Sequence, residues 1–341
     1  MKLTCDTSRA VPKFLYYFFK SHIGKYELLK NASQVGTPGI GQPLTSLKGI
    51  KLNLPPLGFQ NLVADILTSL DDKIELNRQM NATLEAMAQA LFKSWFVDFD
   101  PVIDNALAAG RSIPEPLHAR AEVRAALGDK RKPLPEAIQK QFPSRFVFSD
   151  EMGWVPEGWG VNAIGDVLEL AYGKSLPATK RIDGNVPVYG SGGVSGYHNE
   201  KHAIGPGVVV GRKGTVGSLH WVEEDYFPID TVFYVVEKID IPLFWIYQAL
   251  QRLDIKSMGA DSAVPGVNRN AIYARCFILP PNDLFNTYLL QIEAINTKRR
   301  SLELQNVSFS CLRDTLLPKL LSGQLRIPDA EAAVGAASSV S

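Results

Sequence analysis

The chain has 341 residues, 45% hydrophobic and 21% charged, which is typical of a protein with a sizeable core in two or three domains. Its formal net charge of +1 argues against indiscriminate nucleic-acid binding, and no apolar run of about 18 residues predicts a membrane span. Three cysteines without CxxC spacing and a start unlike a signal peptide favour a reducing cytoplasm over a disulfide framework or zinc site.

Residues 1–57 are expected to hold a strand remnant, a short aromatic helix and a strand-like tail at 51–54. Over residues 58–97 apolar residues recur at alternating steps of three and four, the pattern of a coiled-coil seam. Lys73 and Asn77 interrupt this seam, and polar residues at such positions commonly fix register at some cost in stability. The predicted pairing positions of this helix are Val63, Ile66, Leu70, Met80, Leu84, Met87 and Leu91.

Six prolines between residues 98 and 150 predict a linker with at most one short helix, near 117–127. Residues 151–283 favour a β-rich domain, because short apolar runs such as 167–171 and 208–210 alternate with glycine-dense turns. The predicted fold class is therefore α+β, with a β-rich domain beside long helices.

A second long helix is predicted over residues 284–322, and the Ala/Ser-rich residues 323–341 are expected to be disordered. The two long helices are predicted to pack antiparallel as a coiled coil, so that each covers the apolar seam of the other. On this basis Met80→Asp or Leu84→Asp should be severely destabilising. The predicted pairing positions of the second helix are Ile295, Leu302, Phe309 and Leu316.

The second half of the chain repeats the first. The segment that begins at Pro38 and ends at Pro56 resembles the one from Pro265 to Pro281, and each precedes a long helix. A single offset aligns the two helices, for example Leu91 with Leu316. The second copy has a long globular stretch before this segment and the first has almost none, which indicates a duplicated module whose first copy is partial.

Recognisable catalytic motifs are weak in this chain. Gly173-Lys174-Ser175 matches the end of a phosphate loop, but position 168 is Leu where that loop needs glycine, so a nucleoside triphosphatase is a distant alternative. His198 and His202 have the spacing of zinc ligands without a clear helix, and we interpret them as solvent-exposed. No activated nucleophile or paired acids stand out, so we expect no enzyme and no metal site.

Two glycine-rich loops, at residues 189–199 and 211–217, could let a backbone approach a ligand closely. Their polar side chains offer donors for base edges and phosphates, although tight β-turns alone would explain the glycines equally well. Residues 151–283 hold 11 Lys and Arg against 15 Asp and Glu, so partners would have to supply most phosphate contacts. The candidate DNA-binding residues are Tyr172, Lys174, Ser191, Tyr197, Asn199, Arg212 and Lys213.

Four local motifs, together with the duplication, resemble the specificity subunit of type I restriction–modification systems. They are LTSLDDKIELN at 67–77, LFKSWFVDFDPV at 91–102, GWVPEGW at 153–159 and LPKLLSG at 317–323. The resemblance covers nearly the whole chain and implies two target-recognition domains, each reading half of a split DNA sequence, held apart by antiparallel spacer helices.

The resemblance also implies the partners: double-stranded DNA, methyltransferase subunits and motor-nuclease (restriction) subunits. S-adenosylmethionine, ATP and magnesium would belong to those partners, with no cofactor in this chain. The first copy lacks about eighty residues of a complete recognition domain, so residues 1–57 are expected to form a partial one and 151–283 a complete one. A second copy of the chain is a further candidate partner.

The sequence therefore predicts a non-catalytic, sequence-specific DNA-recognition subunit in the cytoplasm. The main alternative is an inactive truncated allele or an assembly scaffold, which would bind methyltransferase through its helices without reading DNA. The target bases do not follow from the sequence, because they depend on loop geometry within a degenerate set of pairings.

Overall fold

The computed structural model describes residues 4–30, 48–130, 133–259 and 266–339. The chain forms two compact units: unit one comprises Met1–Ala86 and Ala294–Ser341, and unit two comprises Met87–Glu293. The first residues of the two duplicated segments, Pro38 and Pro265, lie outside the described residues, whereas residues 48–56 and 266–281 of these segments are described. In the described ranges, no helix combines the length and apolar character that crossing a membrane would require.

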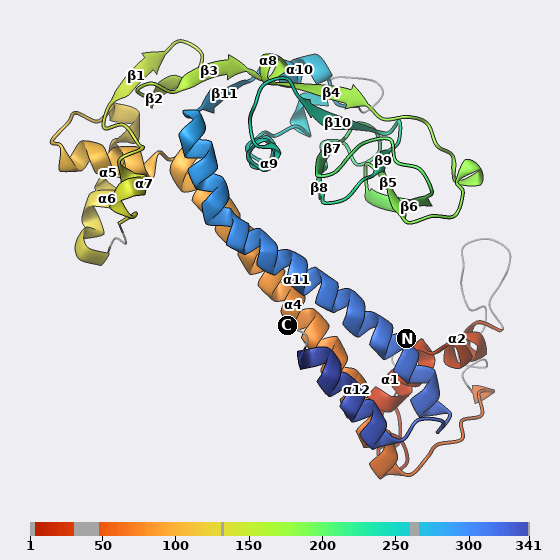
Figure 1. The fold of residues 1–341 in the computed structure, drawn as a ribbon. Helices are drawn as coiled ribbons and strands as arrows, with labels where there is room; N and C mark the ends of the chain where they lie inside the picture. The colour runs from red at the N-terminus through yellow and green to blue at the C-terminus, as the bar shows by residue number, and fades with distance from the viewer. Residues whose placement is uncertain (1–3, 31–47, 131–132, 260–265, 340–341) are drawn as a thin grey trace. The chain divides into compact units, whose positions relative to one another are not determined.

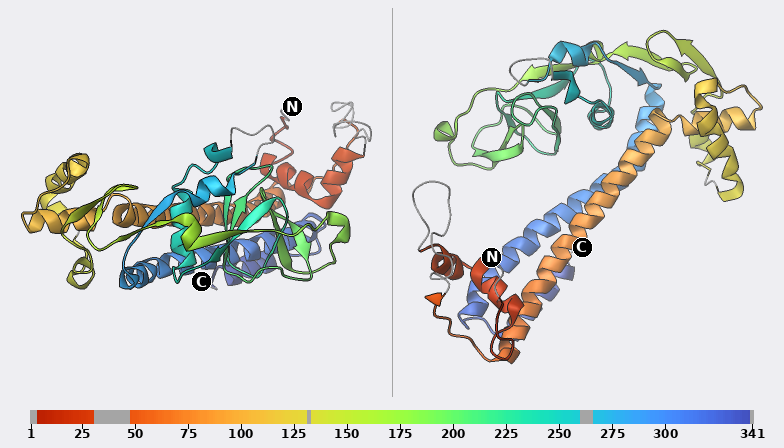
Figure 2. Two further views of the ribbon diagram at one scale, coloured as in Figure 1. Left: turned by 90° about the horizontal axis from the view of Figure 1, so that it is seen from above. Right: turned by 180° about the vertical axis from the view of Figure 1, so that it is seen from behind.

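Two 40-residue helices, α4 (Leu57–Phe96) and α11 (Asn282–Leu321), each contribute a segment to both units. Within each unit their segments lie side by side in antiparallel directions, as predicted (Figures 1 and 2). In unit one the α11 residue number falls as the α4 number rises across three polar contacts: Asp71–Arg313 at 2.7 Å, Asn77–Gln305 at 3.2 Å and Glu85–Arg299 at 2.8 Å. In unit two the Phe92 and Tyr288 rings continue this order, with centroids 6.1 Å apart.

Most of the predicted pairing positions are buried, and in unit one they share a core with α1 (Pro12–Lys20) and α12 (Ile327–Ser339). Leu84, Leu91 and Ile295 are only partly buried, while six others are at most 7% exposed: Val63, Ile66, Leu70, Leu302, Phe309 and Leu316.

The predicted seam was wrong at Met80 and Met87, whose residues are 37% and 53% exposed. The buried neighbours include Asn77 and Ala88, and Asn81 also has a buried side-chain oxygen. Alternating steps of three and four from Ile74 reach positions 77, 81, 84 and 88. The prediction instead chose the larger apolar side chains at positions 80 and 87, which lie next to 81 and 88 in the sequence. Asn77 is therefore part of the seam and does not interrupt it.

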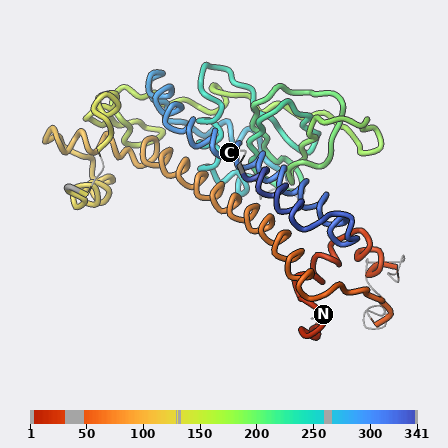
Figure 3. The backbone as a smooth tube through the Cα atoms, turned by 60° about the horizontal axis from the view of Figure 1, so that its bottom comes forward, coloured from red at the N-terminus to blue at the C-terminus, as the bar shows by residue number. Residues whose placement is uncertain are grey.

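In unit one, α1 (Pro12–Lys20) and α2 (His22–Leu29) precede the start of α4, and α1 packs against it (Figure 3). The Tyr17 hydroxyl donates to Asp71 at 2.8 Å, and the Val11 N–H donates to the Gln60 side chain at 2.8 Å. The aromatic helix was thus predicted, but residues 51–54 are not a strand. The corresponding residues of the second copy, 276–279, form a strand because they pair with residues 160–163. The described residues of unit one contain no strand that could pair with residues 51–54 in this way.

The C-terminal segment is a helix and not the predicted disordered tail. Helix α12 (Ile327–Ser339) begins next to Pro328 and is rich in alanine, the strongest helix former. Ala330 is fully buried in the core of unit one, and Lys73 of α4 donates a hydrogen bond to Ser338. Burial against α4 therefore orders a segment whose composition alone suggested disorder.

Residues 98–150 of unit two form a helical block where a linker with at most one short helix was predicted. The helix expected near 117–127 is present, and two more helices accompany it. The helices of the block are α5 (Asp100–Ala108), α6 (His118–Ala126) and α7 (Glu136–Gln139), with short 3-10 turns at Glu115–Leu117 and Gly128–Lys130. The prolines do not break these elements: Pro101 and Pro116 occupy first helical turns, where a missing N–H costs nothing.

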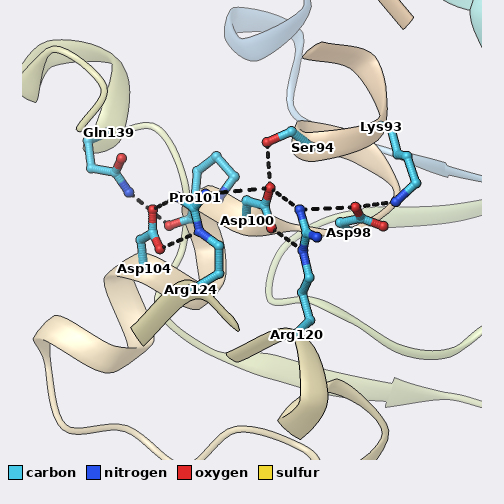
Figure 4. A network of polar contacts seen from close by, with 9 residues as sticks. All are labelled: Lys93, Ser94, Asp98, Asp100, Pro101, Asp104, Arg120, Arg124 and Gln139. Carbon is cyan, nitrogen blue, oxygen red and sulfur yellow. Dashed lines mark hydrogen bonds and ion pairs between the residues drawn. The ribbon is translucent and has the colours of Figure 1, made fainter. Parts of the chain in front are cut away.

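A network of charged side chains stabilises this block (Figure 4). Arg120 donates two hydrogen bonds of 2.7 Å to Asp100, Ser94 donates a third to the same carboxylate, and Arg124 binds Asp104. Burial would raise the pKa of Asp100, but the hydrogen bonds from Arg120 and Ser94 hold it below its usual value.

The β-rich part of unit two contains four small sheets. Strands β4, β10, β7 and β8 form one antiparallel sheet in that order, β6–β5–β9 form a second, and β1–β2 and β11–β3 are two-stranded. The predicted apolar runs at 167–171 and 208–210 correspond to β4, at the edge of the first sheet, and β7, in its middle. The strands are β1 (Phe146–Ser149), β2 (Gly153–Pro156), β3 (Gly160–Ala163), β4 (Leu168–Tyr172), β5 (Val186–Gly190), β6 (Gly193–His198), β7 (Gly207–Gly211), β8 (Leu219–Val222), β9 (Phe227–Pro228), β10 (Val232–Glu237) and β11 (Cys276–Leu279).

Helix α9 (Leu243–Gln251) covers the four-stranded sheet, with α8 (Ile164–Val167) and α10 (Arg269–Tyr273) beside it. Trp245 of α9 also joins an aromatic cluster with the end of α4, where its ring centroid lies 5.5 Å from that of Phe92. Large aromatic side chains contribute much of the buried apolar area in such cores.

We predict that Leu67→Asp lowers the free energy of unfolding of unit one by several kcal/mol, because it places an unpaired charge at a fully buried position of the helix pair. Leu76→Asp is the matched control, since Leu76 is 57% exposed on the same helix and should change stability by less than about 0.5 kcal/mol. Urea unfolding followed by circular dichroism measures both, and equal losses would contradict the observed seam.

We predict that Asp100→Asn destabilises unit two by about 2 kcal/mol at pH 7, because the buried Asp100 loses charged hydrogen bonds to Arg120, whose side chain is 38% exposed. Since the pKa of Asp100 is lowered by folding, this stabilisation is present above the unfolded value near 3.8 and is lost as the pH falls through the folded pKa. The gap between wild type and variant should therefore shrink as the pH falls below 3.8. Exposed Asp183→Asn should stay within about 0.5 kcal/mol of wild type. A gap for Asp100→Asn independent of pH would contradict this assignment.

Candidate functional site

Loops from three parts of unit two converge at one end of the four-stranded sheet, around the segment between β9 and β10 (Figure 1). Carbonyl oxygens of this segment accept hydrogen bonds from both sides. The Lys174 N–H donates to Pro228 at 3.0 Å, and the N–H groups of Arg212 and Lys213 donate to Thr231 at 2.9 and 3.1 Å. The ends of β4 and β7 are therefore fixed to one short stretch of backbone.

The turn of the β5–β6 hairpin joins the same region through Ser191. The Ser191 hydroxyl accepts from the Thr215 N–H at 3.2 Å, and its carbonyl accepts from the Ser218 hydroxyl. His220 Nε2 lies 3.1 Å from the same carbonyl. We call the surface formed by residues 172–174, 190–193, 211–217, 228–231, 256 and 266–269 the loop edge.

Glycine is required at two points where backbones of the loop edge approach closely. A Cβ on Gly173 would lie 2.1 Å from the Ile229 carbonyl oxygen, and one on Gly211 would lie 2.3 Å from that of Thr215. Both distances are shorter than any allowed contact, so a side chain at either position would force the loops apart. The glycine density noted in the sequence thus reflects packing between loops as well as turns.

The loop edge contains five of the seven candidate DNA-binding residues: Tyr172, Lys174, Ser191, Arg212 and Lys213. The other two lie toward the opposite end of the β5–β6 hairpin. Tyr197 is the partner of Pro187 in that hairpin, and Asn199 follows the strand and packs against Gly184.

Two basic residues of the loop edge were not among the predicted residues. The guanidinium of Arg269 lies over the Tyr172 ring, and its segment is tied to the edge by a Val267 N–H that donates to the Arg212 carbonyl at 3.2 Å. The backbone of Lys256 lies against Gly217. Arg269 lies three residues after Gly266 in the duplicated segment, and the duplication indicates a repeated module without marking Arg269 as a contact residue.

Positive charge is therefore concentrated at the loop edge, although residues 151–283 are acidic in balance. Elsewhere in this domain Lys201 pairs with Asp225 at 2.6 Å, and Arg181 donates to the Ser195 carbonyl at 2.7 Å. The edge holds five of the eleven basic residues, Lys174, Arg212, Lys213, Lys256 and Arg269, and one acidic residue, the exposed Asp230.

The other sequence motifs take structural roles. Gly173-Lys174-Ser175 leads into an irregular segment and a 3-10 turn at Ala178–Lys180, where a phosphate loop would open an α-helix. His198 is 6% exposed and its Nδ1 accepts from the Ile182 N–H at 3.1 Å, so its predicted exposure was wrong, whereas His202 is exposed. Among the described residues, no group of three or more His, Cys, Asp or Glu side chains could hold a metal ion.

A separate apolar pocket of about 310 Å³ lies at the aromatic cluster of unit two. Phe92, Trp154, Trp245 and Phe277 are among its lining residues, with Arg252 as its one charged group. A pocket with this lining provides no acid–base pair for catalysis. The loop edge remains the better candidate for a functional site.

The comparison with known families decides the class of the chain. The family described as "Type I restriction modification DNA specificity domain" matches residues 3–86 and 156–301. The chain belongs to this family. Each matched segment contains one of the two internal copies, in agreement with the duplication, and the specificity-domain match includes all of the β-rich strands from β3 to β11.

Curated relatives extend the match over most of the chain. The HindI specificity subunit of Haemophilus influenzae is 28% identical over 376 residues, which cover 95% of this chain and 80% of that protein. The MjaIX specificity subunit of Methanocaldococcus jannaschii is 23% identical, and its alignment covers 94% of this chain and 70% of that protein.

A solved structure shares the fold. The crystal structure of the type I restriction–modification S subunit from M. genitalium has a TM-score of 0.54 and 19% identity, and the alignment covers 92% of this chain and 74% of that one. The chain is thus a specificity subunit with a target-recognition domain and antiparallel spacer helices.

Proposed function

We propose that this chain is the sequence-reading subunit of a type I restriction–modification complex, and that the loop edge of unit two contacts duplex DNA. The observation that carries the proposal is the gathering of five basic residues with Tyr172 and Ser191 at one sheet end of an otherwise acidic domain. Arg and Lys side chains can bind guanine edges or phosphates, and Ser can bind several bases.

The charge balance of the domain requires partners for tight binding. Phosphate contacts supply most of the affinity in protein–DNA complexes, and five basic residues on one edge are few for a stable complex. Methyltransferase subunits around the same duplex would provide the remaining contacts. The long helices α4 and α11 would dock these subunits, and motor-nuclease subunits would join the complex.

In this proposal the chain performs no chemistry itself. S-adenosylmethionine, ATP and magnesium would be bound by the partner subunits, and the contribution of this chain is to choose the site. The function is therefore a difference in affinity between DNA sequences, which base-edge contacts of about 1–3 kcal/mol each can supply.

The alternative of a scaffold without DNA reading makes a different prediction. A scaffold would bind methyltransferase through its helices but leave the complex without a preferred sequence. The cations of the loop edge that form no ion pair within the described residues favour the DNA-reading function, because a scaffold has no use for them.

We predict that the purified chain binds duplex DNA weakly at physiological salt, and that a sequence-specific footprint forms only when the methyltransferase subunit of the same system is added. The reason is the deficit of phosphate contacts in the acidic domain. Footprinting on a duplex library, with methylation mapping as a second readout, measures this.

Nanomolar specific binding by the chain alone would contradict the proposed dependence on partners. Co-purification with methyltransferase but no footprint and no preferred methylation site would identify a scaffold instead.

A further inference from the structure

Two guanidinium groups share one exposed aromatic ring at the loop edge. The Cζ of Arg212 lies 4.9 Å from the centroid of the Tyr172 ring, and that of Arg269 lies 5.1 Å from the same centroid. Each also approaches a second ring, Arg212 at 5.8 Å from Phe233 and Arg269 at 5.5 Å from Tyr273. Planar guanidiniums stack well on aromatic faces, so these contacts order both side chains before any ligand binds.

Hydrogen bonds to backbone carbonyls hold the two groups further. Arg212 Nη1 donates to the Asp230 carbonyl at 3.0 Å, and Arg269 Nη1 lies 3.4 Å from the Leu170 carbonyl as a long hydrogen bond. Both arginines are partly buried, whereas the Tyr172 residue is 51% exposed. The side chains are thus preorganised at the surface, which lowers the entropy cost of binding a ligand.

Neither positive charge has a carboxylate oxygen within 4.0 Å among the described residues, although the exposed Asp230 belongs to the same surface. Neither guanidinium forms an ion pair with a carboxylate there, and Arg212 uses the carbonyl of Asp230. Both guanidinium carbons lie close to the centroid of the same ring. The distance between them is therefore at most the sum of their two distances to that centroid, which is about one Debye length at 0.1 M salt. A pair of like charges at this distance repels, and an arginine with a purely structural role would gain more from a carboxylate partner.

We propose that Arg212 and Arg269, ordered by Tyr172, clamp a backbone phosphate of the duplex. This inference rests on the proposed function and assigns Arg269 a role that the sequence motifs did not indicate. A phosphate supplies the missing negative charge and accepts several N–H bonds from two arginines at once. A base edge fits less well, since each guanidinium is held against a ring and a carbonyl at a strand end and has little freedom to extend into a groove.

The test measures affinity of the complete complex with methyltransferase for two duplexes, one with the mapped target sequence and one with that sequence scrambled, across 50–200 mM KCl. Arg269→Ala should weaken binding to both duplexes by a similar factor, roughly tenfold. It should also reduce the slope of log affinity against log salt by about 0.9, as expected for one lost phosphate contact.

Two further variants make the result specific. Arg269→Lys should recover most of the affinity and the salt slope, because a lysine still neutralises a phosphate although it cannot replace a guanidinium fork on guanine. Lys180→Ala, which removes one exposed charge of the same domain beside Arg181, should leave both affinities within about twofold. Thermal unfolding of each variant confirms that the fold is kept.

The outcomes separate the clamp from the proposed function. If the wild-type complex shows no preference for the target duplex, the proposed function fails and the clamp with it. If the wild type binds its target but Arg269→Ala changes nothing, or loses discrimination at one base position with an unchanged salt slope, the clamp alone is overturned.

Discussion

The antiparallel pairing of α4 and α11 is the interaction on which both units depend. In unit one this pair supplies the surface against which α1 and α12 pack, and in unit two the end of α4 enters an aromatic cluster with Tyr288 and Trp245. The seam is not uniformly apolar, because the Asn77–Gln305 hydrogen bond and the Glu85–Arg299 ion pair lie along it. Such polar contacts cost stability but disfavour a shifted register, in which they would lose their partners.

The β-rich domain is acidic in balance but presents basic residues at one edge. An acidic domain repels DNA as a whole, yet hydrogen bonds to the segment between β9 and β10 bring basic residues from distant parts of the chain to one edge. Gly173 and Gly211 permit the close backbone contacts that this arrangement requires. In the proposed complex, partners provide the general attraction to the duplex, while this edge provides a small number of ordered contacts.

The sequence predicted elements with strong periodicity and failed where tertiary contacts decide. Both long helices and the strands β4 and β7 were found, because their hydrophobic patterns are long or regular. The seam was misplaced at Met80 and Met87, since side-chain size favoured them over Asn81 and Ala88, which the helical period brings to the interface. In the block after residue 98, α6 matches the short helix expected near 117–127, but α5 and α7 were missed, as was α12, because prolines at first helical turns and alanine-rich composition resemble linker and disorder. Arg269 was missed since nothing in its local sequence reveals its contact with Tyr172.

Direct contact between the loop edge and DNA is the central claim, and site-specific photo-crosslinking tests it most directly. A photoreactive phenylalanine analogue would replace exposed Lys213 of the loop edge or, in a second protein, exposed Lys180, each assembled with methyltransferase on a target duplex. The account predicts a crosslink to the duplex from position 213, mapped within the recognised sequence, and none from position 180. Crosslinking from position 180 with none from position 213 would contradict the claim that the loop edge contacts DNA.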